Sequence, residues 1–293
     1  LPGLKLKTLE YKHRFSRFDM TWLHDKTEEL LNRVNEVTEK RAFPFFRPFE
    51  NIGSRVRVGR GSYINFTSND YLGLSQSPKL IKPSQAGTAA YGTGLGSARL
   101  QAHSVRHELL EQRLATWLGY EACCNLTTGY QALVGFLSSY LDDDVTVVLD
   151  RLNHASIIDG VLLAKGQHPD LEIRFFKHNR MKSLRKVLRT AEHSKKMVVV
   201  EGLYSVDGDF GKLDDIVQVC REEGAVLVVD DAHGLGTLGP TGRGVPEMFG
   251  VERDVDVLIG TFSKSFGSSG AGLRSQALKL RNVVHAQLRD DGW

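Results

Sequence analysis

The sequence predicts a three-layer α/β sandwich with a mostly parallel central sheet. From about residue 105 onward, short β-branched runs alternate with stretches of helical periodicity, which is typical of parallel strands joined by helical crossovers. The 293 residues, 41% of them hydrophobic, are enough for one large α/β domain or two smaller ones. The predicted strands are Ala122–Leu126, Val145–Leu149, Glu172–Phe176, Met197–Glu201, Ala225–Asp230 and Val255–Ile259.

Composition and charge argue against several classes of protein. The 38 Lys and Arg residues against 35 Asp and Glu give a formal charge of +3, and their scattered positions do not indicate a nucleic-acid partner. Three cysteines, two of them adjacent, suit neither a disulfide framework nor a zinc site. No apolar run is as long as a membrane span, and the N-terminus lacks the pattern of a signal peptide. We therefore expect a cytoplasmic protein without a metal site.

The N-terminal part of the chain, residues 1–46, is predicted to be an arm followed by one helix. Apolar residues recur at helical spacing over residues 22–40, with charged residues between them. Pro44 and Pro48 end this helix, because proline cannot continue the backbone hydrogen bonding.

A β-hairpin is predicted over residues 55–64. Apolar residues there alternate with polar residues or glycine on both sides of a turn at Gly59–Gly61. Residues 68–74 follow as a loop. Asn69 and Asp70 in this loop are ordinary turn residues on local grounds alone.

A glycine-rich segment lies at Tyr91–Arg99. Its glycines superficially suggest a dinucleotide-binding loop, but no predicted strand precedes it and the spacing is not G-x-G-x-x-G. We therefore reject a nucleotide site here. Beyond it, apolar spacing predicts a helix from Val105 that ends at Gly119.

The unusual polar residues of the chain follow the predicted strands. In an open parallel sheet the carboxyl ends of the strands lie at one edge, where ligands of such sheets bind. We therefore expect these residues to belong to one site. They are Thr127–Tyr130, Asn153–His154, Ser205, Asp207, Asp230–His233 and Lys264.

Several of these residues have both a functional and an ordinary interpretation. Thr127–Gly129 precede a predicted helix whose free N–H groups and dipole favour a phosphate, although Thr128 would equally suit a plain N-cap. Asp230 ends a buried apolar strand and needs a cation there, either a protonated pyridine nitrogen or a structural ion-pair partner. A lone histidine such as His154 is more often a satisfied polar residue, whereas His233 lies only three residues after Asp230.

Lys264 lies between Ser263 and Ser265, just after the last predicted strand. Partial burial at this position would lower the pKa of its amine and free the lone pair for a Schiff base. Thr261 and Ser263 could hydrogen-bond a phosphate, and the alternative for this segment alone is a surface lysine in a polar turn. A phosphate site, an aspartate, two histidines and a lysine together indicate pyridoxal 5'-phosphate.

The residues then show a specific resemblance to the α-oxoamine synthases. This family includes 8-amino-7-oxononanoate synthase, 2-amino-3-ketobutyrate CoA ligase, 5-aminolevulinate synthase and serine palmitoyltransferase. SNDYLGL and DDAHG are closer to the oxononanoate branch than to the sphingolipid branch. The matching segments, in order, are Ser68–Leu74 (SNDYLGL), Tyr91–Arg99, Thr128–Tyr130, Leu152–Ser156 (LNHAS), Glu201–Gly208 (EGLYSVDG), Asp230–Gly234 (DDAHG), Gly239–Gly244 (GPTGRG) and Gly260–Gly267.

The resemblance implies the type I fold of pyridoxal-phosphate transferases and a role for each matching residue. Lys264 would form the Schiff base with the cofactor and remove the α-proton of the substrate. His154 would stack on the pyridine ring, Asp230 would bind the ring nitrogen and His233 would lie near the phenolic oxygen. The other implied contacts are Gly129, Tyr130 and Thr261 to phosphate, Thr128 and Ser263 as weaker phosphate contacts, Ser205 to the ring and Asn69 to the substrate.

The implied reaction is the decarboxylative condensation of an amino acid with an acyl thioester. The acyl group would arrive on coenzyme A or on an acyl-carrier protein, and the working unit would be a homodimer with shared active sites. Three alternatives remain open: a serine palmitoyltransferase-like or aminoketobutyrate ligase-like member, a non-catalytic homologous subunit, and a type I aminotransferase.

The chain departs from the family pattern in two places. The spacing between Arg99 and His107 is one residue short of R-x-x-x-G-x-x-x-x-H and lacks its glycine. Residues 269–272 run directly into a predicted helix over residues 274–293, and the arginine that holds the amino-acid carboxylate in the family has no counterpart. The predicted parts are the N-terminal arm and helix, 1–46, the cofactor-binding large domain, 47–271, and a fragment of an incomplete small C-terminal domain, 272–293.

Overall fold

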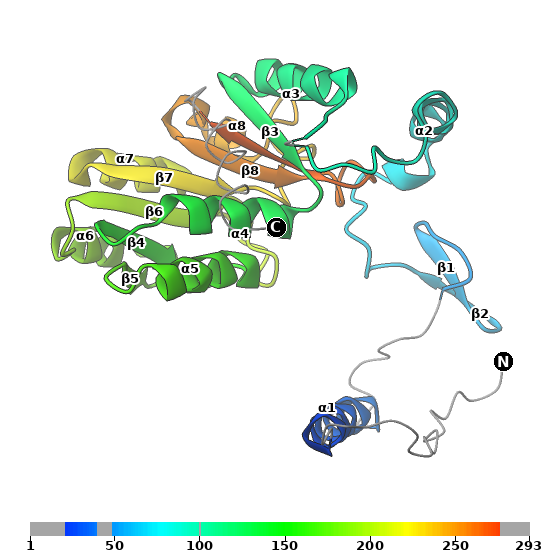
Figure 1. Cartoon of the computed structure of the whole chain (residues 1–293), viewed down its shortest axis with the longest axis horizontal. Helices are drawn as coiled ribbons and strands as arrows, with labels where there is room; N and C mark the ends of the chain where they lie inside the picture. The colour runs from blue at the N-terminus through cyan, green and yellow to red at the C-terminus, as the bar shows by residue number, and fades with distance from the viewer. Residues whose placement is uncertain (1–20, 40–48, 100, 276–293) are drawn as a thin grey trace. The chain divides into compact units, whose positions relative to one another are not determined.

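The computed structural model in Figure 1 describes residues 21–39, 49–99 and 101–275. The chain divides into two compact units, residues 1–66 and residues 67–293. This division lies further along the chain than the boundary predicted after residue 46.

In its described residues, 21–39 and 49–66, the first unit contains one helix and one hairpin. Helix α1 covers Thr21–Glu39, and Glu29 on it accepts hydrogen bonds from Lys26 at 2.8 Å and Arg33 at 2.6 Å. Strands β1 (Arg55–Val58) and β2 (Gly61–Ile64) pair antiparallel, and Gly59 supplies the positive φ of 58° in the turn. The predicted helix and hairpin are both confirmed over these described residues.

A seven-stranded sheet forms the centre of the second unit in the part of the chain that the structure describes (Figure 1). The spatial order is β3-β9-β8-β7-β6-β4-β5. All neighbouring pairs are parallel except those of β9, which is antiparallel to both β3 and β8. The strands are β3 (Ala122–Leu126), β4 (Val145–Asp150), β5 (Glu172–Phe176), β6 (Lys195–Glu201), β7 (Ala225–Asp230), β8 (Val257–Thr261) and β9 (Ala271–Ser275).

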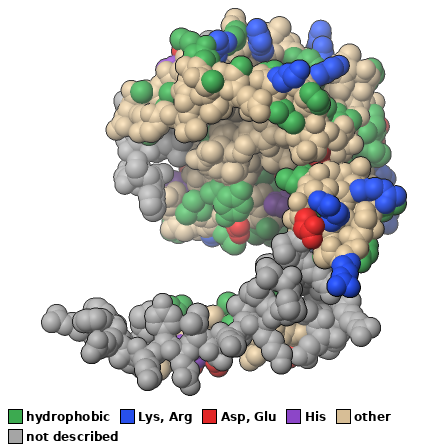
Figure 2. Space-filling view, turned by 90° about the vertical axis from the view of Figure 1, so that its right-hand side faces the viewer, with side chains coloured by type: hydrophobic (Ala, Val, Ile, Leu, Met, Phe, Trp, Pro, Cys, Tyr) green, Lys and Arg blue, Asp and Glu red, His purple; other side chains and the backbone are tan. Residues whose placement is uncertain are grey.

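Helices connect most of the strands, as the sequence predicts. No helix in the described ranges is long and apolar enough to cross a membrane. On the face shown in Figure 2, Lys and Arg side chains are interspersed with hydrophobic and uncharged ones. The helices of this unit are α2 (Pro78–Tyr91), α3 (Val105–Leu118), α4 (Gly129–Tyr140), α5 (Ala155–Gln167), α6 (Met181–Arg189), α7 (Leu213–Glu223) and α8 (Val245–Phe249), with short 3-10 turns at Leu74–Gln76 and Glu252–Asp254.

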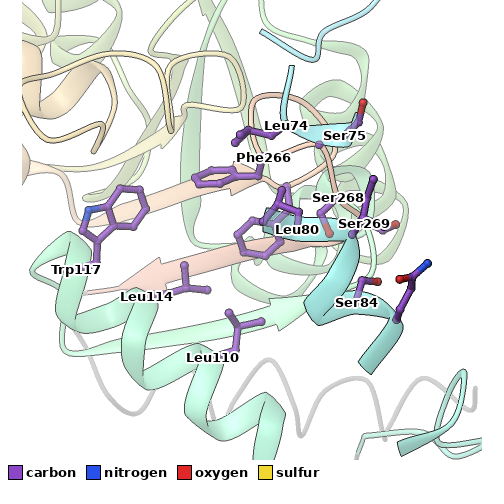
Figure 3. Close-up of a pocket in the computed structure, with 14 residues that line it drawn as sticks. Leu74, Ser75, Leu80, Ser84, Leu110, Leu114, Trp117, Phe266, Ser268 and Ser269 are labelled. Atoms are coloured by element: carbon purple, nitrogen blue, oxygen red, sulfur yellow. The ribbon is translucent and has the colours of Figure 1, made fainter. Parts of the chain in front are cut away.

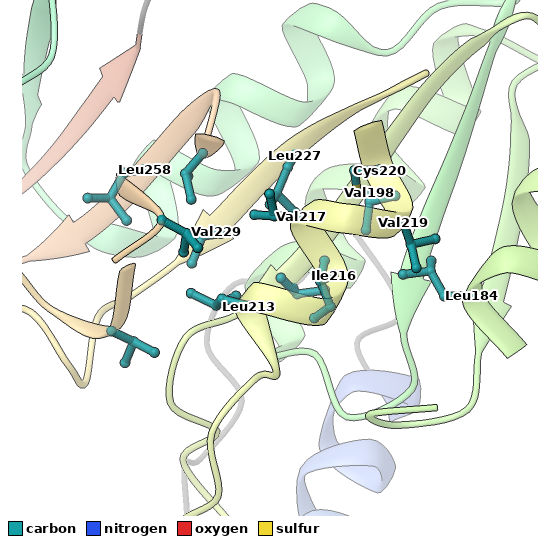
Figure 4. Packing of buried hydrophobic residues seen from close by; sticks show 14 of the residues in the cluster. Leu184, Val198, Leu213, Ile216, Val217, Val219, Cys220, Leu227, Val229 and Leu258 are labelled. Carbon is teal, nitrogen blue, oxygen red and sulfur yellow. The ribbon is translucent and has the colours of Figure 1, made fainter. Parts of the chain in front are cut away.

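Two hydrophobic cores lie on opposite faces of the sheet and confirm the three-layer arrangement. Strand side chains alternate between the faces, so in β6 Val198 and Val200 pack toward α6 and α7 while Val199 packs toward α4 and α5. Figure 4 shows the first core, where Leu213, Ile216 and other apolar residues of α7 meet the strands. These strand residues are completely buried, which explains their continuous apolar character.

Helix α2 and strand β9 are not predicted from the sequence. Helix α2 contains Pro83, which lowers its helical propensity. Strand β9 crosses the predicted boundary at residue 271, so residues 272–275 lie in the sheet. The helix predicted from residue 274 is therefore wrong at Arg274 and Ser275, and the rest of that prediction lies outside the described residues.

Helices α4 and α5 pack closely because α5 has a glycine at their contact. A Cβ at Gly160 would lie 3.1 Å from the Cβ of Leu137 and 3.1 Å from the Cα of Val134, both on α4. Gly166, about 1.7 turns further along α5, has nothing within 4 Å of such an atom. Both helices begin at the candidate site described below, so this contact fixes the spacing of two of its walls.

We expect Gly160→Leu to lower the free energy of unfolding by about 1–3 kcal/mol, because the added side chain overpacks the α4–α5 contact. The matched variant Gly166→Leu should be neutral or stabilising by up to about 1 kcal/mol, since leucine is the better helix former. Urea unfolding of both variants checks this. Equal stability of the two variants would contradict the close contact.

Candidate active site

A polar cavity of about 230 Å³ lies where strands β6, β7 and β8 end. Every cofactor-binding residue predicted from the sequence lines it except Ser205, which is exposed in the loop after β6. The lining residues are Thr128, Gly129, Tyr130, Leu133, His154, Ser156, Glu201, Asp230, Ala232, His233, Ile259, Gly260, Thr261, Ser263 and Lys264.

A second cavity, of about 690 Å³, lies between α2, α3 and the loop after β8 (Figure 3). Leu80, Leu110, Leu114, Trp117 and Phe266 make its lining apolar. None of its lining residues is titratable. The smaller polar cavity is therefore the candidate active site.

One end of the polar cavity is suited to an anion. Thr128 is the N-cap of α4 and accepts the N–H of Gln131 at 3.0 Å, so the ordinary capping role holds for its side chain. The N–H groups of Gly129 and Tyr130 belong to the first turn of this helix, where backbone donors and the dipole attract negative charge. Across from Gly129, the Thr261 and Ser263 hydroxyls lie 2.7 Å apart.

Lys264 reaches the cavity from the turn after β8. Phe262 and Phe266 on either side of it pack edge to face with ring centroids 5.6 Å apart, and Ser265 donates to the carbonyl of Leu235. These contacts fix the turn, and the Lys264 side chain lines the cavity. Burial lowers the pKa of the Lys264 amine, and the nearby carboxyl groups of Asp230 and Glu201 oppose this shift.

Asp230 and Asp231 have different surroundings although they are adjacent. Asp230 ends β7, lines the cavity with 6% of its surface exposed, and accepts the N–H of Ala232 at 3.1 Å. Burial raises its pKa, while Lys264 is the strongest influence in the other direction. Asp231 is completely buried and accepts the N–H of Val245 at 2.8 Å. Only the first aspartate of the DDAHG segment therefore belongs to the cavity.

Lys264 and His233 belong to a chain of polar contacts. Lys264 Nζ lies 2.7 Å from His233 Nε2, and His233 Nδ1 lies 2.6 Å from the hydroxyl of Tyr71. That hydroxyl is 3.3 Å from Asn69 Oδ1, which connects the predicted substrate residue indirectly to the lysine. Burial, followed by the influence of Lys264 and His154, lowers the pKa of His233 to about 4. The imidazole is therefore neutral at pH 7.

His154 is held at the start of α5 by its own side chain and by its backbone. Its Nδ1 accepts the N–H of Ser156 at 3.2 Å and lies 2.6 Å from the Ser156 hydroxyl. Its backbone N–H donates to Glu201 Oε1 at 2.6 Å, and the side chain of Asn153 donates to the carbonyl of Val199 at 2.8 Å. The loop is thus attached to β6 at two points.

Tyr71 and Glu201 are site residues that the sequence analysis did not single out. Tyr71 comes from a loop distant in sequence, and although it lies in the SNDYLGL segment, only Asn69 of that segment was assigned a role. Glu201 could have been found, because it ends a buried strand as Asp230 does. It is 3% exposed, and burial and the neighbouring Asp230 raise its pKa to about 8.

The donor set fits pyridoxal 5'-phosphate. The α4 terminus with the Thr261 and Ser263 hydroxyls suits a phosphate, buried Asp230 suits a protonated ring nitrogen, and neutral His233 suits a phenolic oxygen. The lowered pKa of Lys264 suits an amine that reacts with an aldehyde.

Residues 62–289 match the family described as aminotransferase class I and II. The chain belongs to this family. Its relatives within the family are α-oxoamine synthases, as the sequence motifs predict. The predicted fold class is confirmed with it. A solved structure of the serine palmitoyltransferase of S. paucimobilis contains pyridoxal 5'-phosphate, the cofactor predicted here from the sequence.

The similarity to individual relatives covers most of this chain but less of theirs. The 8-amino-7-oxononanoate synthase of Cellvibrio japonicus is 42% identical over 76% of this chain, and that of Geobacter sulfurreducens is 39% identical over 88%. The chain spans 56% and 66% of the length of these two relatives. Among solved structures, the serine palmitoyltransferase of Sphingomonas wittichii is 30% identical, with a TM-score of 0.79 over 90% of this chain and 71% of that one.

Stability should depend on His233 in acid. The folded-state pKa of His233, about 4, lies below the value of about 6.5 for an unfolded histidine. As the pH falls from about 6.5 towards 4, the unfolded chain therefore binds a proton that the folded chain does not, and the free energy of unfolding decreases. We expect His233→Asn to lose less stability than the wild type between pH 7 and pH 5. Urea midpoints at the two pH values measure this, and parallel losses in both proteins would refute it.

Proposed function

We propose that the protein is a pyridoxal-phosphate-dependent acyltransferase of the 8-amino-7-oxononanoate synthase type. It would condense an amino acid with an acyl thioester, with loss of carbon dioxide, to give an α-amino ketone. The observation that carries this proposal is the cavity in which Lys264, His233 and Asp230 meet beside the first turn of α4. The level of identity to the oxononanoate synthases, about 40%, supports the reaction type.

The geometry of the side chains supports the proposed roles. When bound, pyridoxal phosphate supplies an aldehyde for an amine and a ring that withdraws electrons from the α-carbon of the substrate. Lys264 would bind the aldehyde and move the proton at the α-carbon, and burial supports this role because it lowers the pKa of the amine. Asp230 would keep the ring nitrogen protonated, and His154 would stack on the ring.

The remaining assignments complete the proposal. Gly129, Tyr130 and Thr261 would bind phosphate, with Thr128 and Ser263 beside them. Ser205 would contact the ring and Asn69 the substrate if the loops that carry them close on the cavity. The acyl group would come from coenzyme A or an acyl-carrier protein, in the cytoplasm, where free buried cysteines such as Cys220 are usual.

A serine palmitoyltransferase-like activity is the second candidate. The serine palmitoyltransferase of S. paucimobilis matches the fold with a TM-score of 0.82 over 91% of this chain at 31% identity. Because the oxononanoate synthases are more similar in sequence, the first candidate is preferred. The lysine in its polar cavity argues against a non-catalytic subunit.

We expect Lys264→Ala to abolish covalent attachment of pyridoxal phosphate and turnover, because in the described chain Lys264 is the only lysine that lines the cavity. Borohydride reduction followed by peptide mapping locates the modified residue. The control is Lys165→Ala, which removes an amine that donates to the carbonyls of Pro169 and Leu171 instead. Cofactor fixed by borohydride in the Lys264 variant would overturn the assignment.

We also propose a homodimer in which the glycine-rich segment faces the cofactor of the partner subunit. Residues of this segment line a cavity of about 840 Å³ together with Arg106 and His107. Positive φ angles at Gly92 (78°) and Gly96 (61°) give the segment a backbone that residues with side chains rarely adopt. Such a surface permits close approach of another molecule.

Mixing two inactive variants tests the shared site. Lys264→Ala removes the amine, and Gly94→Trp blocks the glycine-rich segment. If each site uses Lys264 of one subunit and the segment of the other, mixed dimers should regain up to about a quarter of wild-type activity when subunits pair at random. Light scattering at micromolar concentration checks the dimer, and a monomer or an inactive mixture would count against the proposal.

A further inference from the structure

Glu201 and Asp230 end adjacent parallel strands at the same level. The strand register pairs Glu201 of β6 directly with Asp230 of β7. Glu201 is 3% exposed and Asp230 is 6% exposed, and both line the polar cavity. Two carboxylates this close in a buried place repel each other strongly, so the pair retains a proton in conditions where isolated acids would lose theirs.

Contacts around Glu201 connect it to His154. Its Oε1 accepts the backbone N–H of His154 at 2.6 Å, and its own N–H donates to the Tyr204 hydroxyl at 3.3 Å. The hydrogen bond to His154 joins the end of β6 to the first residue before α5. The Glu201 side chain on β6 thereby holds the backbone of His154 and so limits where its imidazole lies in the cavity.

We propose that Glu201 is a positioning residue that holds His154 at the start of α5 and takes the proton of the Glu201–Asp230 pair, leaving the negative charge on Asp230. The consequence for the cofactor rests on the function proposed above: a charged Asp230 can bind a protonated ring nitrogen, and an anchored His154 can stack on the ring. The state of the Glu201 carboxyl group itself does not depend on that function.

The groups that face the pair favour this distribution of the proton. Glu201 meets Asp230, Lys264, Asp150 and the N–H of His154, and burial together with Asp230 raises its pKa to about 8. Burial raises the pKa of Asp230 as well, and Lys264, the Ala232 N–H and His154 favour its charged form, Lys264 most strongly. Lys264 also favours the charged form of Glu201, but the strongest neighbour of Glu201 is Asp230, which favours the neutral form. Because the strongest neighbour of Asp230 is a cation and that of Glu201 is an anion, we assign the retained proton to the glutamate.

Carbon-13 NMR of the glutamate carboxyl groups in the cofactor-free chain tests the proton. We expect a resonance that titrates at about pH 8 and disappears in Glu201→Gln. It should persist in the control Glu222→Gln, which changes an exposed carboxyl group paired with Arg185 on the surface. A Glu201 resonance that titrates near the ordinary value of about 4.3 would overturn the proposal.

The pH dependence of unfolding gives a second measurement. An acid whose pKa is raised by folding stabilises the protein fully below its unfolded pKa and loses that contribution as the pH rises through the folded value. The urea midpoint of Glu201→Gln should therefore rise relative to the wild type as the pH is raised from 5 to 9. A constant difference between the two proteins would show that Glu201 is ionised throughout and would overturn the proton assignment.

Hydrogen exchange at the His154 amide tests the positioning role. Glu201→Ala removes the acceptor and should speed exchange by about tenfold, which corresponds to the loss of a neutral hydrogen bond of about 1.4 kcal/mol. Glu201→Gln retains an acceptor oxygen and should keep the protection. Unchanged exchange in Glu201→Ala would overturn the role. Because none of these measurements needs cofactor or turnover, their outcome is separate from that of the proposed function.

Discussion

The amine of Lys264 and the two buried carboxyl groups at the carboxyl ends of β6 and β7 are the ionisable groups that the rest of this structure must hold together. Burial favours the neutral form of each group, lowering the pKa of the lysine and raising those of Asp230 and Glu201. Neighbouring strands lie only about 4.8 Å apart, so the carboxyl groups cannot separate without breaking the sheet. The cores on both faces, which hold the strands rigidly, are therefore what keeps this unfavourable arrangement in place.

The strands that carry these groups could be predicted because they are buried on both faces. Val198, Val199 and Val200 alternate between the two cores and are apolar without interruption. Strand β9 has no comparable signal, since Ala271 and Gly272 begin it and it contains no β-branched residue. Its conformation depends on pairing with β3 on one side and β8 on the other, which a local pattern does not contain.

The candidate site could be predicted where it follows strand ends and not where it depends on loops. The rule that ligands bind beyond the carboxyl ends of parallel strands placed Asp230 and Lys264 together, and it applies equally to Glu201. Tyr71 reaches His233 across 162 positions of sequence, a contact that only the folded loop creates. Ser205 was expected from its position after β6, but the bridge between Leu203 and Phe210 closes that loop and leaves the serine exposed.

The two ends of the polar cavity favour opposite charges. The first turn of α4 and the Thr261 and Ser263 hydroxyls form an end that favours anions, while Glu201 and Asp230 form an end that favours a cation. A ligand with a phosphate at one end and a protonated nitrogen at the other is bound well in only one of its two orientations. Lys264 lies one residue after Ser263, so the same turn that helps to bind the phosphate also presents the amine. The orientation of the ligand and the position of the amine are therefore set together by the end of β8.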